Sequence, residues 1–254
     1  MSRLREGRFR CGTSGYQYPH WRGVFYPADL PPSKWFSHYA RVFDTVEINN
    51  TFYRLPPAEV FERWRAAAPP GFLYALKFSR FGTHVKRLRD PAPVLENFLD
   101  RASRLEEHLG PILVQLPPNW KARPERLEGF FEAAAGAPVR WVVEFRDPSW
   151  LSEEVFRILE RHGAALCIHD LLEDHPRRRT ADWVYLRYHG VNYGGRYGPA
   201  RLAREAAEIV EWLRAGIDVF AYFNNDREGW AVKDARDLRR FVGTRLRPGV
   251  RTPR

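Results

Sequence analysis

The chain has 254 residues, of which 44% are hydrophobic and 28% are charged. This composition is typical of a folded globular protein and excludes a collagen-like repeat, a long disordered chain or a small disulfide scaffold. The formal net charge is +10, which suggests nucleic acid as a partner. However, residues 1–10 hold four arginines and one acidic residue, and residues 244–254 hold four arginines and no acidic residue. The two ends therefore carry much of the excess.

The two cysteines, Cys11 and Cys167, both fall within apolar segments of strand length. We expect them to be buried free thiols, which are typical of a reducing compartment. The N-terminus has no apolar stretch of signal-peptide length, and the chain has no run of about 18 apolar residues that could cross a membrane. The sequence therefore predicts a cytoplasmic protein with no membrane partner.

Apolar segments of strand length alternate with amphipathic segments along the chain. Eight strands are predicted, at Phe9–Thr13, Thr45–Asn49, Phe72–Ser79, Pro111–Leu116, Arg140–Arg146, Ala164–Asp170, Asp182–His189 and Ile217–Asn224. Helices are predicted at Val60–Ala68, Val94–Leu109, Glu125–Ala135, Glu153–His162, Ala203–Ala215 and Val232–Val242. This alternation predicts a single (β/α)8 TIM-type barrel over about residues 9–242, irregular between strands six and seven. The basic tails, 1–8 and 244–254, are expected to be flexible.

Side chains alternate between the two faces of a strand. Six of the predicted strands have one apolar face and one face with polar or charged groups, mostly at the C-terminal end of the strand. Barrel enzymes keep their active sites at that end. An internal network of ion pairs without a ligand is the structural alternative, but buried ion pairs stabilise proteins poorly. The pattern therefore favours a functional site at the C-terminal mouth.

Several motifs in these strands and the loops after them resemble the YecE-like family. They are CGTSGY (11–16), WRGVFYP (21–27), VEINNTFY (46–53), QLPP (115–118), EFR (144–146), RYHG (187–190) and YFNN (222–225). That family is a domain of unknown function, number seventy-two in its series. The resemblance spans about residues 9–242 and implies a TIM-type barrel. It brings no settled activity, and a similarity to phosphodiester-cleaving barrels is only suggested.

Three cations, Lys77, Arg146 and Arg187, are predicted around the C-terminal mouth of the barrel. Arginine binds phosphate or carboxylate through two parallel hydrogen bonds. A Gly-rich loop at 190–198 follows the seventh strand, where barrels often bind phosphate. We therefore expect an enzyme, of hydrolase or lyase type, that acts on a small phosphorylated or other anionic substrate without an organic cofactor. The expected acid–base residues are Glu47, Glu144 and His189. The expected substrate-binding residues are Tyr16, Asn49, Lys77, Gln115, Arg146, Arg187, Tyr193, Asn224 and Asn225.

Four alternatives use the same mouth. The two glutamates could serve a glycosidase, but their cationic neighbours would keep both ionised. Metal-assisted phosphodiester cleavage could use His169, Asp170, His189, Glu47, Glu144 and Asp226. The sequence has no short motif with the spacing of metal ligands, and the cations would repel a divalent ion. Of the possible metal sites, a site for a single ion is the alternative that stays open. The charge and the aromatic residues could bind nucleic acid, and the last alternative is a ligand-binding protein without catalysis.

Overall fold

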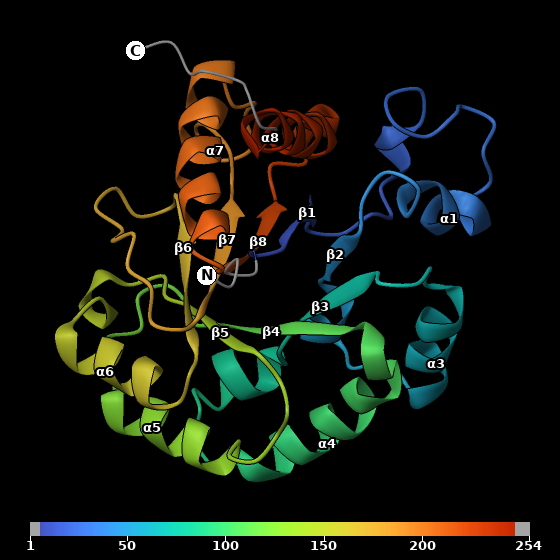
Figure 1. Cartoon of the computed structure of the whole chain (residues 1–254). Coiled ribbons are helices and arrows are strands. Elements are labelled where there is room, and N and C mark those ends of the chain that lie inside the picture. Colours follow the sequence, from blue (N-terminus) through green and yellow to red (C-terminus); the bar gives the residue numbers. More distant parts are fainter. Residues whose placement is uncertain (1–5, 247–254) are drawn as a thin grey trace, which may run out of the picture.

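Eight parallel strands form a closed barrel in the computed structural model, which describes residues 6–246 (Figure 1). The strands are β1 (Phe9–Thr13), β2 (Thr45–Ile48), β3 (Leu73–Lys77), β4 (Leu109–Gln115), β5 (Trp141–Glu144), β6 (Ala165–His169), β7 (Trp183–Tyr188) and β8 (Asp218–Phe223). Each strand from β2 to β8 pairs with its neighbour in the sequence, and β1 pairs with β8. The predicted (β/α)8 barrel is confirmed, with strand ends within a few residues of those expected.

The seam between β1 and β2 closes the ring. Ser14 and Glu47 form a parallel bridge there, and the amide of Gly15 donates to the Glu47 carbonyl at 2.8 Å. Farther down the seam the Tyr39 hydroxyl takes the place of a backbone hydrogen bond. It accepts from the Thr13 amide at 2.9 Å and donates to the Thr45 carbonyl at 3.0 Å. A side chain from the first βα segment is therefore part of the barrel wall.

Helices surround the strands (Figure 1). They are α1 (Trp35–Tyr39), α2 (Asn50–Tyr53), α3 (Ala58–Ala67), α4 (Ala92–Ala102), α5 (Pro124–Ala133), α6 (Glu153–Arg161), α7 (Pro199–Arg214) and α8 (Trp230–Leu246). All six predicted helices are present, and residues 170–182, between β6 and β7, contain no helix, as expected. The helix predicted to reach Leu109 ends at Ala102, and a 3-10 segment follows it. The structure adds α1, α2 and a π-helical turn at Phe81–Val85, which are too short for periodicity to predict.

Two corrections concern the predicted tails. Helix α8 continues to Leu246, so residues 244–246 are helical rather than part of a flexible tail. At the other end, the backbone amide of Gly7 donates to the Leu213 carbonyl, and that of Arg8 donates to the Asp218 carboxylate. Residues 7 and 8 are therefore bonded to the barrel rather than part of a flexible tail. Residues 1–5 and 247–254 lie outside the described residues.

Successive side chains of the strands point to opposite sides of the barrel wall, as predicted. One side chain of each pair packs under the helices, and the next points into the barrel. The inward face carries the predicted charged side chains Glu47, Lys77, Glu144 and Arg187, which are buried. It also carries an apolar layer, which consists of Ala75, Leu113, Val142, Ala165, Cys167, Trp183, Tyr185, Phe220 and Tyr222. Cys11 and Cys167 are both buried free thiols, as expected. None of the helices between residues 6 and 246 has the length and apolar content needed to cross a membrane.

Candidate functional site

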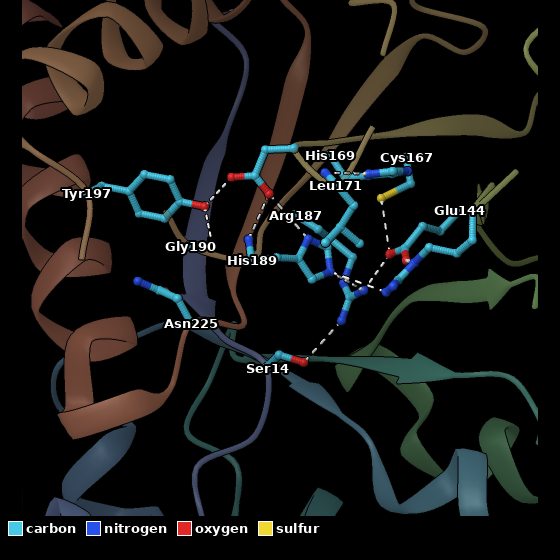
Figure 2. Close-up of polar contacts among 12 residues, drawn as sticks. Ser14, Glu144, Cys167, His169, Leu171, Arg187, His189, Gly190, Tyr197 and Asn225 are labelled. Atoms are coloured by element: carbon cyan, nitrogen blue, oxygen red, sulfur yellow. Dashed lines mark hydrogen bonds and ion pairs between the residues drawn. The ribbon is translucent and has the colours of Figure 1, made fainter. Parts of the chain in front are cut away.

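Arg187 lies at the centre of a polar cluster at the C-terminal end of the barrel. It is the fifth residue of β7, and its side chain is 1% exposed. Its Nη2 donates to Glu47 Oε1 at 2.7 Å and its Nε to Glu47 Oε2 at 3.0 Å, so the pair is bidentate. Its Nη1 contacts Glu144 Oε2. Figure 2 shows the guanidinium between Ser14 and Glu144. Arg187 thus joins the two predicted carboxylates, which come from β2 and β5.

Glu47 is completely buried and fully engaged. Besides Arg187 it accepts hydrogen bonds from the Ser14 hydroxyl and, at 2.7 Å, from the Tyr185 hydroxyl. The amide of Asn49 in turn donates to Ser14 Oγ at 3.0 Å. Burial raises the pKa of Glu47, but the charge and the hydrogen bonds of Arg187 outweigh burial and hold that pKa below its ordinary value.

Glu144 is equally buried and is paired with two arginines. Arg146 Nε contacts its Oε1, while Arg187 contacts its Oε2. Burial acts to raise the pKa of Glu144, but the two guanidinium groups lower it well below its ordinary value. Both carboxylates are therefore ionised at neutral pH. A glycosidase needs one protonated carboxyl as its acid, and this cluster does not provide one.

His189 follows β7 and is held between arginines and an aspartate. Its Nε2 lies 3.2 Å from Arg187 Nη1 and 3.4 Å from Arg146 Nη2, and its Nδ1 lies 3.4 Å from Asp170 Oδ1. Burial lowers the pKa of His189 and Arg187 lowers it further, while Asp170 opposes them. A neutral imidazole with its proton on Nδ1 satisfies these contacts, because Nε2 then accepts from the guanidinium groups.

Three side chains form the accessible surface of the cluster. Arg146 is 16% exposed, and its Nη2 donates to Gln115 Oε1 at 3.3 Å. Gln115 and Lys77 are 8% and 7% exposed. Lys77 Nζ lies 4.3 Å from the centre of the Phe52 ring, and within residues 6–246 it has no hydrogen bond or ion pair. Burial and Arg187 lower the pKa of Lys77 to about 8. Anything that enters the mouth meets these side chains before it meets either glutamate.

A model of the protein family of unknown function called DUF72 matches residues 10–254. The chain belongs to the DUF72 family. A DUF72 protein from Thermotoga maritima MSB8 has a crystal structure with a TM-score of 0.84 and 31% identity, over 93% of this chain and 99% of that one. YunF of Bacillus subtilis strain 168 is 23% identical over 84% of this chain and 88% of YunF. YecE of Escherichia coli strain K12 is 32% identical, but the match spans only 45% of this chain and 42% of YecE. The resemblance that the sequence motifs indicate is therefore confirmed. The description of the family names no function.

The Asn225 side chain of this DUF72 protein supports the Gly-rich loop after β7. Its amide donates to the Gly195 carbonyl at 3.0 Å and to Asp234 of α8 at 2.7 Å, and the residue is fully buried. Gly190 has a φ of +95°, and a Cβ there would lie 2.7 Å from the Gly195 carbonyl oxygen. The structure therefore places Asn225 behind the loop, where its side chain holds the loop to α8.

The other predicted binding residues lie around the cluster, and of these Asn49 is hydrogen-bonded to it through Ser14. Tyr16 is 7% exposed and packs on Phe36 and Tyr39, but it also lines a pocket of about 150 Å³ together with Asn49. Tyr193 is 70% exposed, and its ring stacks over that of His189 at a centroid distance of 6.5 Å. Asn224 is half-buried, and its backbone amide donates to the Tyr188 carbonyl.

Two residues of the polar cluster, and a histidine beside Phe52, were not predicted as site residues. Ser14 and Tyr185 both donate to Glu47, and His84, in the π-helical turn, lies 5.1 Å from the Phe52 ring. Tyr185 lies two residues before Arg187 on the same face of β7, so strand periodicity could have identified it. Nothing in the periodicity of the chain indicates His84, because its position depends on a loop.

Two further features bear on the alternatives. In the part of the chain that the structure describes, no three His, Cys, Asp or Glu side chains gather closely enough to hold a metal ion.

A cavity of about 670 Å³ lies at the opposite, N-terminal end of the barrel, where Leu73, Leu109 and Asp218 begin their strands. Residues at that end of a TIM barrel generally serve stability rather than catalysis.

Proposed function

We propose that this DUF72 protein is an enzyme that acts on a small phosphorylated or other anionic substrate at the C-terminal mouth of the barrel. The observation that supports this most is the Lys77 ammonium group, which is nearly buried and has no carboxylate partner within the described residues. The central cluster holds three cations, Lys77, Arg146 and Arg187, and within residues 6–246 its two glutamates form ion pairs only with the arginines.

Buried charges are costly unless they are paired, so a site with a surplus cation favours an anion. Arg146 adds a second donor, because its Nη1 makes no hydrogen bond within residues 6–246 while its Nε and Nη2 are fixed by Glu144, Gln115 and His189. A carboxylate or phosphate between Lys77 and Arg146 would accept charge-assisted hydrogen bonds from both.

The contacts of the predicted acid–base residues support a positioning part for them in this proposal. Glu144 and His189 contact Arg146 directly, and Glu47 contacts Arg187, so the three residues orient the guanidinium groups. Proton exchange by these residues with a substrate stays a prediction. The proposal uses no organic cofactor, and we place the protein in the cytoplasm because its two buried thiols are free.

Anion binding is tested with inorganic phosphate by calorimetry and by thermal shift. Lys77→Met and Arg146→Met should each weaken binding by at least about tenfold, because a hydrogen bond to a charged group contributes about 1.5–3 kcal/mol. Lys34→Met and Arg204→Met remove the same charges from exposed positions that have no side-chain ion pair within residues 6–246, and they serve as matched controls.

Catalysis is tested by screening phosphorylated and carboxylated metabolites for binding and then for turnover. Phosphate binding that all four variants reduce equally would overturn the proposed site. Compounds that bind at the mouth and are never converted would favour a ligand-binding protein without catalysis. Nucleic-acid binding stays a prediction. If inorganic phosphate competes with nucleic acid for the protein, the nucleic acid binds at the same mouth.

A further inference from the structure

Lys77 differs from the other cations of the mouth in its chemistry. A guanidinium keeps its proton at any physiological pH, whereas a lysine that loses its proton becomes a nucleophilic amine. Lys77 is the last residue of β3, its side chain is 7% exposed, and its Nζ faces the ring of Phe52 rather than a carboxylate. Burial and the charges of Arg187 and Arg146 lower the pKa of Lys77, while Glu144 and Glu47 oppose them. A larger share of this amine is therefore neutral at pH 7 than of an exposed lysine.

A histidine lies against the same aromatic ring. The π-helical turn Phe81–Val85 places the His84 ring 5.1 Å from that of Phe52, edge to face. The Thr83 hydroxyl donates to the Ser79 carbonyl at 3.0 Å, so it accepts from His84 Nδ1 at 2.9 Å. This arrangement puts the imidazole proton on Nδ1 and leaves the Nε2 lone pair available. Burial and Arg80 lower the pKa of His84 to about 4, so the ring is neutral at pH 7.

This inference rests on the proposed function and names its substrate class. We propose that Lys77 forms a Schiff base with an aldehyde or ketone carbonyl of the anionic substrate, while Arg146 binds its carboxylate or phosphate and His84 relays protons. The substrate is then a small oxo acid or a phosphorylated aldehyde or ketone, because these carry both the carbonyl and the anionic group.

The Schiff base forms by addition, proton transfer and loss of water. The nitrogen lone pair of neutral Lys77 forms a bond to the carbonyl carbon, and the π electrons move to the oxygen. His84 Nε2 accepts a proton from the nitrogen and returns one to the oxygen. A further proton from solvent makes that hydroxyl leave as water. The nitrogen lone pair then closes the C=N bond, so that amine, carbonyl and one proton give an iminium ion and water.

The five lysines of the chain allow an internal comparison, because Lys34, Lys86, Lys121 and Lys233 serve as references for Lys77. The protein is incubated at pH 7 with glyoxylate, an aldehyde that carries a carboxylate, and with sodium cyanoborohydride. The reductant delivers hydride to the iminium carbon and leaves carboxymethyl-lysine, which peptide mass spectrometry locates. We expect Lys77 to be modified at least about tenfold faster than each of the other four, because it is the lysine in cationic, desolvated surroundings.

Two variants separate the roles of the neighbouring residues. Arg146→Met should slow the modification of Lys77 by glyoxylate at least about tenfold more than its reaction with the neutral aldehyde glycolaldehyde. Loss of the Arg146 charge affects the amine in both reactions, but only glyoxylate loses the partner of its carboxylate. His84→Gln should slow the maximal rate with glyoxylate severalfold at an unchanged half-saturating concentration, because the imidazole is proposed to move protons rather than to bind the anion. Inorganic phosphate should protect Lys77 and none of the reference lysines.

The failure of this inference and the failure of the proposed function give different results. If phosphate binds in a manner that depends on Lys77 and Arg146, but Lys77 reacts no faster than Lys34, the Schiff base is wrong and the anion site stands. If neither phosphate nor glyoxylate binds at the mouth, both proposals are wrong. Preferential modification of Lys77 that phosphate does not suppress would also overturn the inference, because the amine and the anion site would then not share one pocket.

Discussion

Replacing Arg187 by methionine tests whether this residue is what holds the polar cluster together. Arg187 is 1% exposed and contacts Glu47 through two hydrogen bonds and Glu144 through a third contact. In the variant Glu144 keeps Arg146, but Glu47 keeps only the hydroxyl groups of Ser14 and Tyr185. The principal loss is therefore one uncompensated buried carboxylate.

Breaking a buried ion pair in this way costs about 3–5 kcal/mol, and we expect the free energy of unfolding at pH 7 to fall by that amount. The dependence on pH should also change. In the wild type the pKa values of Glu47 and Glu144 are lowered, so the stability that they contribute is present above the unfolded pKa of about 4.3 and is lost as the pH falls below it. In Arg187→Met the pKa of Glu47 rises above its unfolded value, so the variant should gain stability as the pH falls from 7 to 5.

Urea unfolding, followed by tryptophan fluorescence at pH 7, 6 and 5, measures both effects. Adding Glu47→Gln to Arg187→Met removes the uncompensated charge and should recover more than half of the loss. Arg204→Met, at an exposed position, should stay within about 0.5 kcal/mol of the wild type. A loss under about 1 kcal/mol with an unchanged pH profile would refute the reasoning.

Three further substitutions test other features. Lys77→Met should raise the free energy of unfolding at pH 7, by on the order of 3 kcal/mol at most, because a pKa lowered from 10.5 to about 8 reflects a destabilised charge. Since that penalty in the wild type disappears as the pH rises from about 8 to 10.5, the two proteins should converge in urea titrations over this range. Tyr39→Phe should cost about 1–3 kcal/mol in urea unfolding, because it leaves two backbone groups unpaired at the β1–β2 seam. Gly190→Ala should lower the melting temperature, at a cost of about 1–3 kcal/mol, because its φ is +95° and its Cβ has no room.

Two of these substitutions have a matched control, and the first has an outcome that would contradict it directly. A Lys77→Met protein less stable than the wild type at pH 7 would mean that the ammonium has a favourable partner in the fold. Tyr53→Phe removes a hydroxyl from a side chain that is 75% exposed, and a loss equal to that of Tyr39→Phe would contradict the role of Tyr39 in the seam. Gly243→Ala lies in α8 with no atom within 4 Å of the new Cβ, and it should stabilise the helix where Gly190→Ala destabilises the loop.

Strand periodicity predicted much of this site because the site is built on strands. Glu47, Lys77, Glu144 and Arg187 occupy strand positions whose side chains must point into a barrel once the strands are correctly identified. The partner of each charge could not be predicted, since it depends on the registers between strands. The sequence shows three cations and two glutamates, but only the structure shows that Arg187 takes both glutamates and leaves Lys77 without one.

The loops explain what the sequence could not predict. Phe52 and His84 meet because α2 and the π-helical turn both lie beyond strand ends, and neither segment is long enough for a periodic pattern. Tyr39 lies in a five-residue helix, and its sequence position gives no sign that its hydroxyl enters the barrel wall. Asn225 was predicted from its position after a strand, but its amide is used by the loop and by α8.

Glu47 serves two purposes with two different groups. Its backbone carbonyl accepts the hydrogen bond that closes the barrel at Gly15, and its carboxylate binds Arg187. The positions around the mouth therefore differ in how well they tolerate substitution when the mouth is redesigned for another substrate. A change at Glu47 would disturb the β1–β2 seam, where its carboxylate also accepts a hydrogen bond from Ser14, whereas Gln115 can be varied without touching that seam. A library that alters specificity while keeping the fold should fix the β1–β2 side and diversify the positions around Gln115 on β4.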